Sequence, residues 1–116
     1  MLKTSHFLAF AAGAALLGWA AAAQGAVTVI GGGMARQCSV AALNGASDAK
    51  SEDICTMALE TEMLSLRDRA GTYVNRGVLK LRRKQFADAQ WDFNRAIDTK
   101  KDLGEAYVNR GAAHVG

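Results

Sequence analysis

The chain contains no proline, only two cysteines and only two histidines. Without proline, cis-prolyl turns and proline hinges are excluded. Neither histidine is suited to a catalytic triad, because His6 lies in a segment expected to be removed and His114 lies near the C-terminal end. The cysteines and histidines also lack the four-ligand spacing of a zinc finger. We therefore expect no enzymatic activity, no cofactor and no metal site.

Strong charge is also absent from the chain. The formal net charge is +3 and 22% of the residues are charged, which is too mild to predict nucleic-acid binding on its own. Apolar residues make up 50% of the sequence, which excludes a disordered or collagen-like chain. Much of that apolar content falls in residues 1–30, so the remainder is too small for an enzyme of the larger α/β classes.

The N-terminus has the layout of a secretory signal peptide. A basic start precedes the apolar run Phe7–Leu17, and small residues then lead to the sequence AAAAQG, which ends at Gly25. Ala23 and Gly25 supply small residues at the −3 and −1 positions of a cleavage site before Ala26. We therefore predict a signal peptide at 1–25 and a periplasmic or secreted protein.

The cysteine count agrees with export. Cys38 and Cys55 allow a single intrachain pairing, and in an oxidising compartment such a pair is most simply a disulfide. Closing a loop of this size stabilises a protein by about 3 kcal/mol in the chain-entropy model. Two free buried thiols are the alternative.

An internal repeat carries the strongest signal. The segment Tyr73–Gly77, YVNRG, recurs as Tyr107–Gly111 at an offset of 34 residues. Thirty-four residues is the period of the tetratricopeptide repeat, and the chain from Ala70 onward resembles that family. Residues of the expected aromatic, glycine and alanine types stand at Tyr73, Gly77, Phe86, Ala89, Phe93 and Ala96. The chain departs from the family pattern at Arg76, Lys80, Lys84 and Lys101.

Residue spacing in the repeat region predicts helices without reference to the family. Small and apolar residues at three- and four-residue steps mark one face of a helix from Leu66, with Ser65 as its N-cap. A second helix begins near Phe86, and a third begins at Glu105.

The upstream region reads as a degenerate helix pair. A short helix is expected over 34–43, a flexible loop over 44–50 and a second helix over 51–63, with Ser51 as its cap. Because each predicted helix carries one cysteine, a disulfide would pin the two together.

These patterns together predict an all-α fold of the tetratricopeptide-like, α-solenoid type. The expected organisation is a signal peptide at 1–25, a tail and disulfide-pinned helix pair at 26–64, and a tetratricopeptide-like region at 65–116. That region would hold one full repeat and part of a second. Because residue 116 falls inside a first helix of a repeat, we expect a truncated array with a loosely held final helix.

Three further patterns have competing interpretations. Residues 27–33 imitate a strand and phosphate loop, but the third glycine and a βαβ unit are missing, which favours a simple tail over a nucleotide site. The basic run 79–84 could contact anionic lipid or nucleic acid, although a solvated helix end is favoured. Arg76 is expected to be structural and to pair with Asp92 or Asp88.

The tetratricopeptide resemblance implies a binding groove along the first helix of each repeat. It places Asn75 and Asn109 on the concave surface, where asparagines can hydrogen-bond the backbone of an extended peptide. The residues expected to share this peptide-binding surface are Val74, Val78, Arg82 and Val108. The alternative places both asparagines on a solvent-exposed polar helix face.

We therefore predict an exported, non-enzymatic scaffold that binds a protein or peptide in its groove, with no nucleic-acid partner. The alternative is a membrane-anchored envelope assembly factor. Its anchor would be an uncleaved N-terminal helix over 7–30, which is long enough to span a bilayer.

Overall fold

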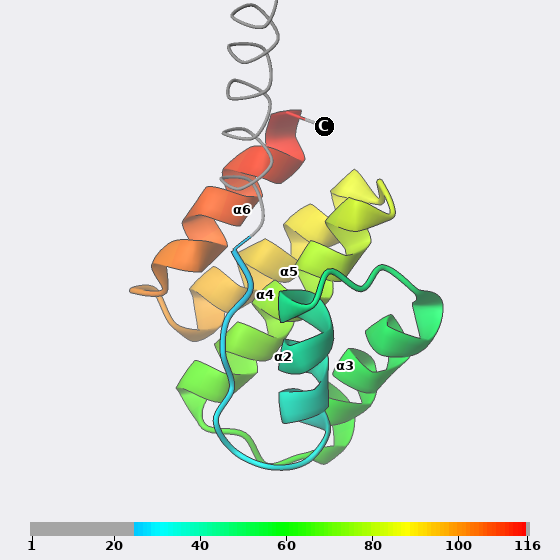
Figure 1. The fold of residues 1–116 in the computed structure, drawn as a ribbon. Coiled ribbons are helices and arrows are strands. Elements are labelled where there is room, and N and C mark those ends of the chain that lie inside the picture. The colour runs from blue at the N-terminus through cyan, green and yellow to red at the C-terminus, as the bar shows by residue number, and fades with distance from the viewer. Residues whose placement is uncertain (1–24, 116) are drawn as a thin grey trace, which may run out of the picture.

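The computed structural model describes residues 25–115, and this part of the chain is all-helical, as predicted. Except for Gly25, the expected signal peptide lies outside the described residues. The helices are α2 (Met34–Leu43), α3 (Ala49–Thr61), α4 (Leu66–Arg82), α5 (Phe86–Thr99) and α6 (Gly104–Val115) (Figure 1). Within residues 25–115, no helix is long and apolar enough to cross a membrane.

The five helices pack in two layers (Figure 1). One layer is formed by α2, α4 and α6, with α4 in contact with both of its neighbours. The other layer is formed by α3, which packs on α2 and α4, and by α5, which packs on α4 and α6. An extended segment, residues 25–30, crosses the first layer from α6 to α2.

The helix α3 begins earlier than the sequence predicts. Asp48, rather than Ser51, is the N-cap, and its carboxylate accepts a hydrogen bond from the Ser51 amide at 3.1 Å. The Ser51 hydroxyl donates to the same carboxylate at 2.7 Å, and these two bonds lower the pKa of Asp48. The loop expected over 44–50 is therefore shorter, because a carboxylate three residues upstream competes successfully for the cap.

Both ends of α4 are closed by local hydrogen bonds. The predicted N-cap is confirmed, since the Ser65 hydroxyl accepts from the Asp68 amide at 3.1 Å. At the other end, the amides of Lys84 and Gln85 donate to the carbonyls of Leu81 and Lys80, both at 2.9 Å, which is the pattern of a Schellman motif. Lys84 adopts φ 61° there, a left-handed conformation that normally favours glycine.

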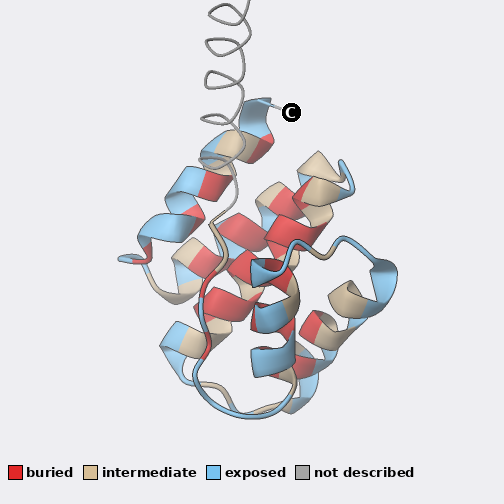
Figure 2. Ribbon diagram, viewed as in Figure 1, coloured by how far each residue is buried: buried red, intermediate tan, exposed pale blue. Residues whose placement is uncertain are grey.

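The largest hydrophobic cluster lies between α4, α5 and α6 and includes Val27 of the extended segment (Figure 2). Phe93 is its largest fully buried side chain. A Cβ added to Gly77 would lie 2.5 Å from the Phe93 ring, so glycine is required where α4 crosses α5. Two smaller clusters join α2 and α3 to the rest, one around Val29 and one around Cys38, Cys55 and Leu79.

Candidate functional site

The central contact of the extended segment is made by Asn75 on α4. The Val27 amide donates to Asn75 Oδ1 at 2.7 Å, and Asn75 Nδ2 donates to the Val27 carbonyl at 2.8 Å. The side chain amide thus exchanges two hydrogen bonds with one residue, as a neighbouring β-strand would. Asn75 is completely buried, so these bonds are shielded from water.

Asn109 repeats this contact one repeat length along the chain. The Gly25 amide donates to Asn109 Oδ1 at 3.1 Å, and Asn109 Nδ2 donates to the Gly25 carbonyl at 2.9 Å. Asn109 Nδ2 also donates to the Glu105 carbonyl within α6 at 2.8 Å. Two asparagines from α4 and α6 therefore bind alternate residues of one extended strand.

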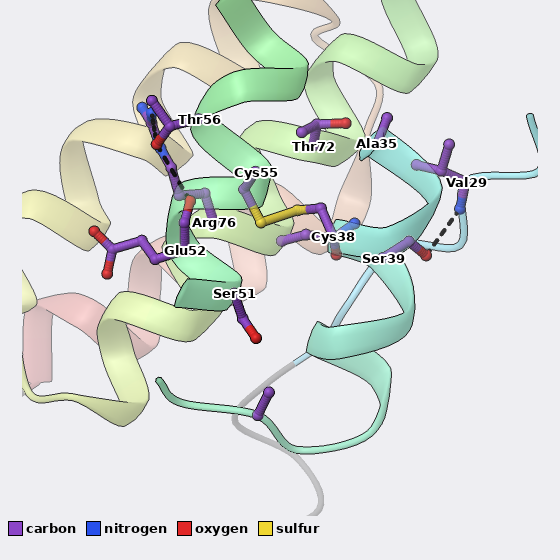
Figure 3. The surroundings of a disulfide bond; sticks show 12 residues. Val29, Ala35, Cys38, Ser39, Ser51, Glu52, Cys55, Thr56, Thr72 and Arg76 are labelled. Carbon is purple, nitrogen blue, oxygen red and sulfur yellow. Dashed lines mark hydrogen bonds between the residues drawn. A yellow bond between two sulfur atoms is a disulfide. The ribbon is translucent and has the colours of Figure 1, made fainter. Parts of the chain in front are cut away.

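Ser39 on α2 holds the other end of the segment. Its hydroxyl accepts from the Val29 amide at 3.0 Å and donates to the Val27 carbonyl at 3.0 Å (Figure 3). Sequence reasoning missed Ser39, because α2 has no counterpart of the YVNRG repeat to mark it. We call the surface formed by Ser39, Asn75 and Asn109 the strand face.

The side chains of the segment alternate between the strand face and solvent. Val27 and Val29 are 1% and 3% exposed, whereas Thr28 and Ile30 are exposed. A Cβ added to Gly71 of α4 would lie 2.8 Å from Val27 Cγ1, so glycine makes room for that valine. This two-residue alternation is that of a half-buried β-strand.

The predicted peptide-binding residues fall in different environments. Asn75 and Asn109 both point inward and are buried, so the alternative of a solvent-exposed polar face is wrong. Val74 and Val78 are completely buried in the cluster that also holds Val27. Val108 is 59% exposed.

Arg82, the remaining predicted groove residue, fastens α4 to α2. Its guanidinium donates to the carbonyls of Ala42 at 2.7 Å and Ala46 at 2.9 Å, just where α2 ends. Burial lowers the pKa of Arg82. The structure thus places this side chain at a helix C-terminus, where a cation complements the helix dipole.

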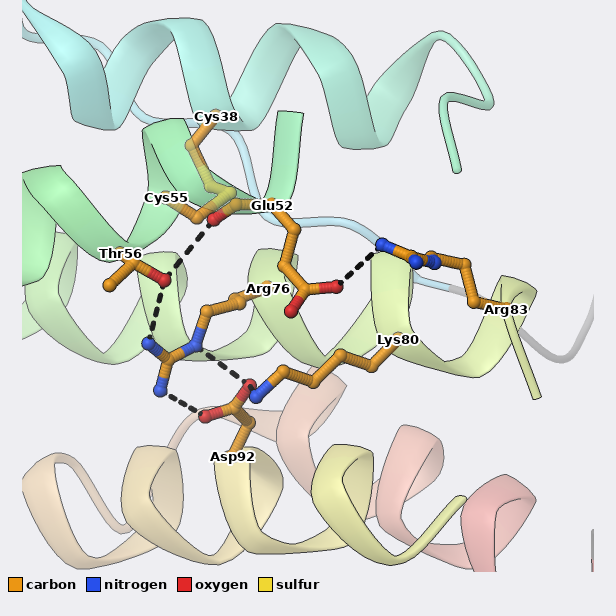
Figure 4. A network of polar contacts seen from close by, with 8 residues as sticks. All are labelled: Cys38, Glu52, Cys55, Thr56, Arg76, Lys80, Arg83 and Asp92. Carbon is orange, nitrogen blue, oxygen red and sulfur yellow. Dashed lines mark hydrogen bonds and ion pairs between the residues drawn. A yellow bond between two sulfur atoms is a disulfide. The ribbon is translucent and has the colours of Figure 1, made fainter. Parts of the chain in front are cut away.

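A charged network behind the strand face confirms the predicted pairing of Arg76 with Asp92 (Figure 4). Arg76 donates two hydrogen bonds to the Asp92 carboxylate, at 2.6 Å and 3.0 Å, and Lys80 Nζ lies 3.1 Å from the same group. Burial lowers the pKa of Arg76, but the hydrogen bond and charge of Asp92 outweigh it, so the pKa lies above its usual value. Arg76 also donates to the Thr56 hydroxyl at 3.1 Å, which ties α3 to α4 and α5.

The basic run 79–84 is largely engaged within the molecule. Lys80 pairs with Asp92, Arg82 binds two carbonyls and Arg83 lies 3.4 Å from the Glu52 carboxylate. These contacts favour the interpretation of the run as a helix end.

The glycine run leads into a helix N-terminus that is already occupied. The Glu62 carboxylate accepts from the amides of Met34 and Ala35, both at 2.8 Å, at the start of α2. A phosphate would bind in the position that this carboxylate takes. Residues 25–30 are extended but pair with no other β-strand among the described residues, and the interpretation as a tail rather than a nucleotide site is favoured.

A disulfide joins Cys38 of α2 to Cys55 of α3, with the two Cα atoms 4.9 Å apart (Figure 3). Both cysteines are completely buried, and the bond is consistent with an oxidising, non-cytoplasmic compartment. Among residues 25–115, no group of three or more potential metal ligands comes together, and no enclosed pocket is present.

Comparison of the chain with protein-family models, curated proteins and solved structures finds no match.

Proposed function

We propose that this protein is an exported, non-enzymatic scaffold of the tetratricopeptide type that binds an extended segment of a protein partner in the groove formed by α2, α4 and α6. The observation that carries the proposal is the pair of asparagine clamps. Asn75 and Asn109 each exchange two hydrogen bonds with the backbone of an extended strand.

Backbone recognition of this kind suits a peptide-binding surface. Main-chain hydrogen bonds supply affinity that is independent of the peptide sequence, and pockets for alternate side chains supply specificity. The strand face offers both, since Asn75 and Asn109 bind main-chain atoms while the side chains of Val27 and Val29 fill buried positions against the helices.

Removal of a signal peptide during export would free Asn109 from its contact with Gly25. Cleavage before Ala26, as proposed from the sequence, would separate Gly25 from the chain and remove both bonds between Gly25 and Asn109. The exported protein would then present the α6 end of the strand face to a partner while Val27 still occupied Asn75. The disulfide supports a periplasmic or secreted location.

The same contacts restrict which residues could form the anchor in the alternative, a membrane-anchored assembly factor. Val27 and Val29 are buried against the helices, so an anchor over 7–30 could not include them while the strand face holds them. Such an anchor would have to end before Gly25. The small residues Ala23 and Gly25, which suit cleavage before Ala26, favour the cleaved, exported form.

The proposal is tested by selecting binders from a displayed library of random seven-residue peptides over the disulfide-bonded protein that begins at Ala26, in which Asn109 is free of Gly25. Binding of each selected peptide is then measured on the wild type, on Asn109→Ala and on the control Asn94→Ala, which alters an exposed asparagine of α5. We expect at least tenfold weaker binding to Asn109→Ala and unchanged binding to the control. No enrichment, or binding that is insensitive to Asn109, would overturn the proposal.

A further inference from the structure

We propose that the extended segment, residues 25–29 before cleavage and 26–29 after it, is an intramolecular ligand of the strand face, and that the partner displaces it with a segment of the same pattern. That pattern is an extended stretch with a small residue followed by two β-branched apolar residues, each separated by one unrestricted position. The proposal rests on the proposed function. It adds the kind of segment that the partner supplies, and it says what occupies the strand face when no partner is bound.

The hydrogen bonds that hold the segment come from side chains. Ser39, Asn75 and Asn109 contact main-chain atoms of Gly25, Val27 and Val29, and Arg67 donates to the Thr28 carbonyl at 3.2 Å. The helices complete their own backbone hydrogen bonds without the segment. Because every peptide carries these main-chain atoms, a second extended strand could make the same bonds.

The buried positions define which side chains fit. Val27 lies over Gly71, with its Cγ1 only 2.8 Å from where a Cβ would be, and Val29 packs with Ala35 and Ala58. A Cβ added to Gly25 would lie 3.6 Å from Asn109 Nδ2, which is an ordinary contact, so a small side chain fits there. Thr28 points outward and imposes no choice.

A glycine run separates the segment from α2 and lets it leave. Gly31 and Gly32 are exposed with nothing within 4 Å of an added Cβ, and Gly33 adopts φ 84°. Through such a short linker the segment has an effective concentration of about millimolar, so it masks the site against weaker competitors. Cutting this linker should therefore make it possible to measure how tightly the strand face binds a separate extended peptide.

The experiment cuts the linker after the protein has folded. A recognition sequence for a specific protease is inserted between Gly31 and Gly32 of the full-length chain, and the disulfide is kept oxidised. The probe is a fluorescent synthetic peptide with the sequence QGAVTVIG, which copies residues 24–31. Its binding is followed by fluorescence anisotropy before and after cleavage, once the released fragment has been removed by size exclusion. Circular dichroism checks that the helices persist.

We expect the probe to bind the cut protein at least tenfold more tightly than the uncut protein. A matched peptide with aspartate at the position of Val27 should fail to bind, and Asn75→Ala in the cut protein should weaken the probe at least tenfold. Equal binding before and after cleavage, or no binding to a cut protein that is still helical, would overturn the inference.

The two proposals can fail separately. If library peptides bind in an Asn109-dependent way but do not compete with the probe, the partner-binding function stands and the intramolecular-ligand inference is wrong. If the probe binds the cut protein but the library yields no binder, the extended segment is a ligand of the strand face, and the proposed function, with the displacement by a partner, is wrong.

Discussion

The two copies of YVNRG place the same five residues in different surroundings. In the first copy, on α4, Val74 is completely buried, Arg76 pairs with Asp92, and Gly77 meets the Phe93 ring. In the second copy, on α6, Val108 is 59% exposed and nothing lies within 4 Å of a Cβ added to Gly111.

Two features are nevertheless common to both copies. Asn75 and Asn109 clamp the extended segment in the same way, and in each copy the arginine lies over the tyrosine ring, at 5.7 Å for Arg76 and 5.5 Å for Arg110. The stacked pair is local to one helix turn, and the clamp depends only on the strand. The valine, the glycine and the salt bridge depend on α3 and α5, which pack against α4.

The largest difference should appear on replacing the arginines. Arg76→Met leaves the completely buried Asp92 with Lys80 alone, and breaking a buried pair costs about 3 kcal/mol. Arg110→Met removes an exposed hydrogen bond to Asn94 at 3.2 Å and the contact with the Tyr107 ring, and should lower the free energy of unfolding by about 1 kcal/mol or less. Urea unfolding of both variants measures the difference, and equal effects would show that the network around Asp92 does not stabilise the first copy.

Replacing the asparagines should give a smaller difference in the same direction. Asn75→Ala leaves the buried Val27 amide without an acceptor, at a cost of about 2 kcal/mol. Asn109→Ala acts on the partly buried Gly25 and should cost about 1 kcal/mol or less. Hydrogen exchange provides the second readout, because the Val27 amide should lose protection in Asn75→Ala and keep it in Asn109→Ala. Retained protection in both would contradict the clamp.

Replacing the two glycines by alanine should change the stability of the protein in opposite directions. In Gly77→Ala the new methyl group meets the buried Phe93 ring, and overpacking of this kind costs about 1–3 kcal/mol. In Gly111→Ala the methyl enters open space, and the better helix propensity of alanine should stabilise the protein by up to about 1 kcal/mol. Thermal unfolding measures both variants, and a Gly77→Ala protein that is as stable as the wild type or more stable would show that the helix crossing does not require glycine.

The smallest expected effect concerns the end of the first copy's helix. Lys84→Gly relieves the left-handed backbone at φ 61° and should stabilise the protein by about 1 kcal/mol. The matched control is Gly45→Ala at the end of α2, where φ is 84° and the added methyl meets nothing, so only backbone strain is introduced. That variant should be destabilised by a similar amount. A destabilised Lys84→Gly would show that the lysine side chain contributes more than the strain removes.

Local signals predicted the helices well. The Ser65 cap and the three- and four-residue spacing located the start of α4, because these signals depend on neighbouring residues, and the short helix expected over 34–43 matches α2. The start of α3 was predicted too late, since Asp48 and Ser51 are both good caps and their competition is decided by the fold. Asp92 and Asp88 were both predicted as partners of Arg76 because they lie on the following helix, and the structure shows that Asp92 is the partner.

For the candidate site, the sequence predicted residues on the helices but not the segment that they bind. The repeat singled out Asn75 and Asn109, but no local pattern identified residues 25–29 as the strand they hold, because that contact joins distant parts of the chain. Ser39 was missed for the same reason, because no local pattern marks its contact with the segment. Val74 and Val78 were assigned to the groove from the tetratricopeptide resemblance. Their complete burial depends on the neighbouring helices, which no local pattern describes.

The extended segment also imposes an order on folding. Val27 meets Asn75 48 residues later in the sequence, and Gly25 meets Asn109 84 residues later. A chain that emerges from the ribosome or a membrane pore with its N-terminus first therefore makes the segment early and docks it last, since contacts distant in sequence require the largest loop closures. Val27 therefore stays in water at least until α4 has been made, and the contact of Gly25 with Asn109 forms only after α6.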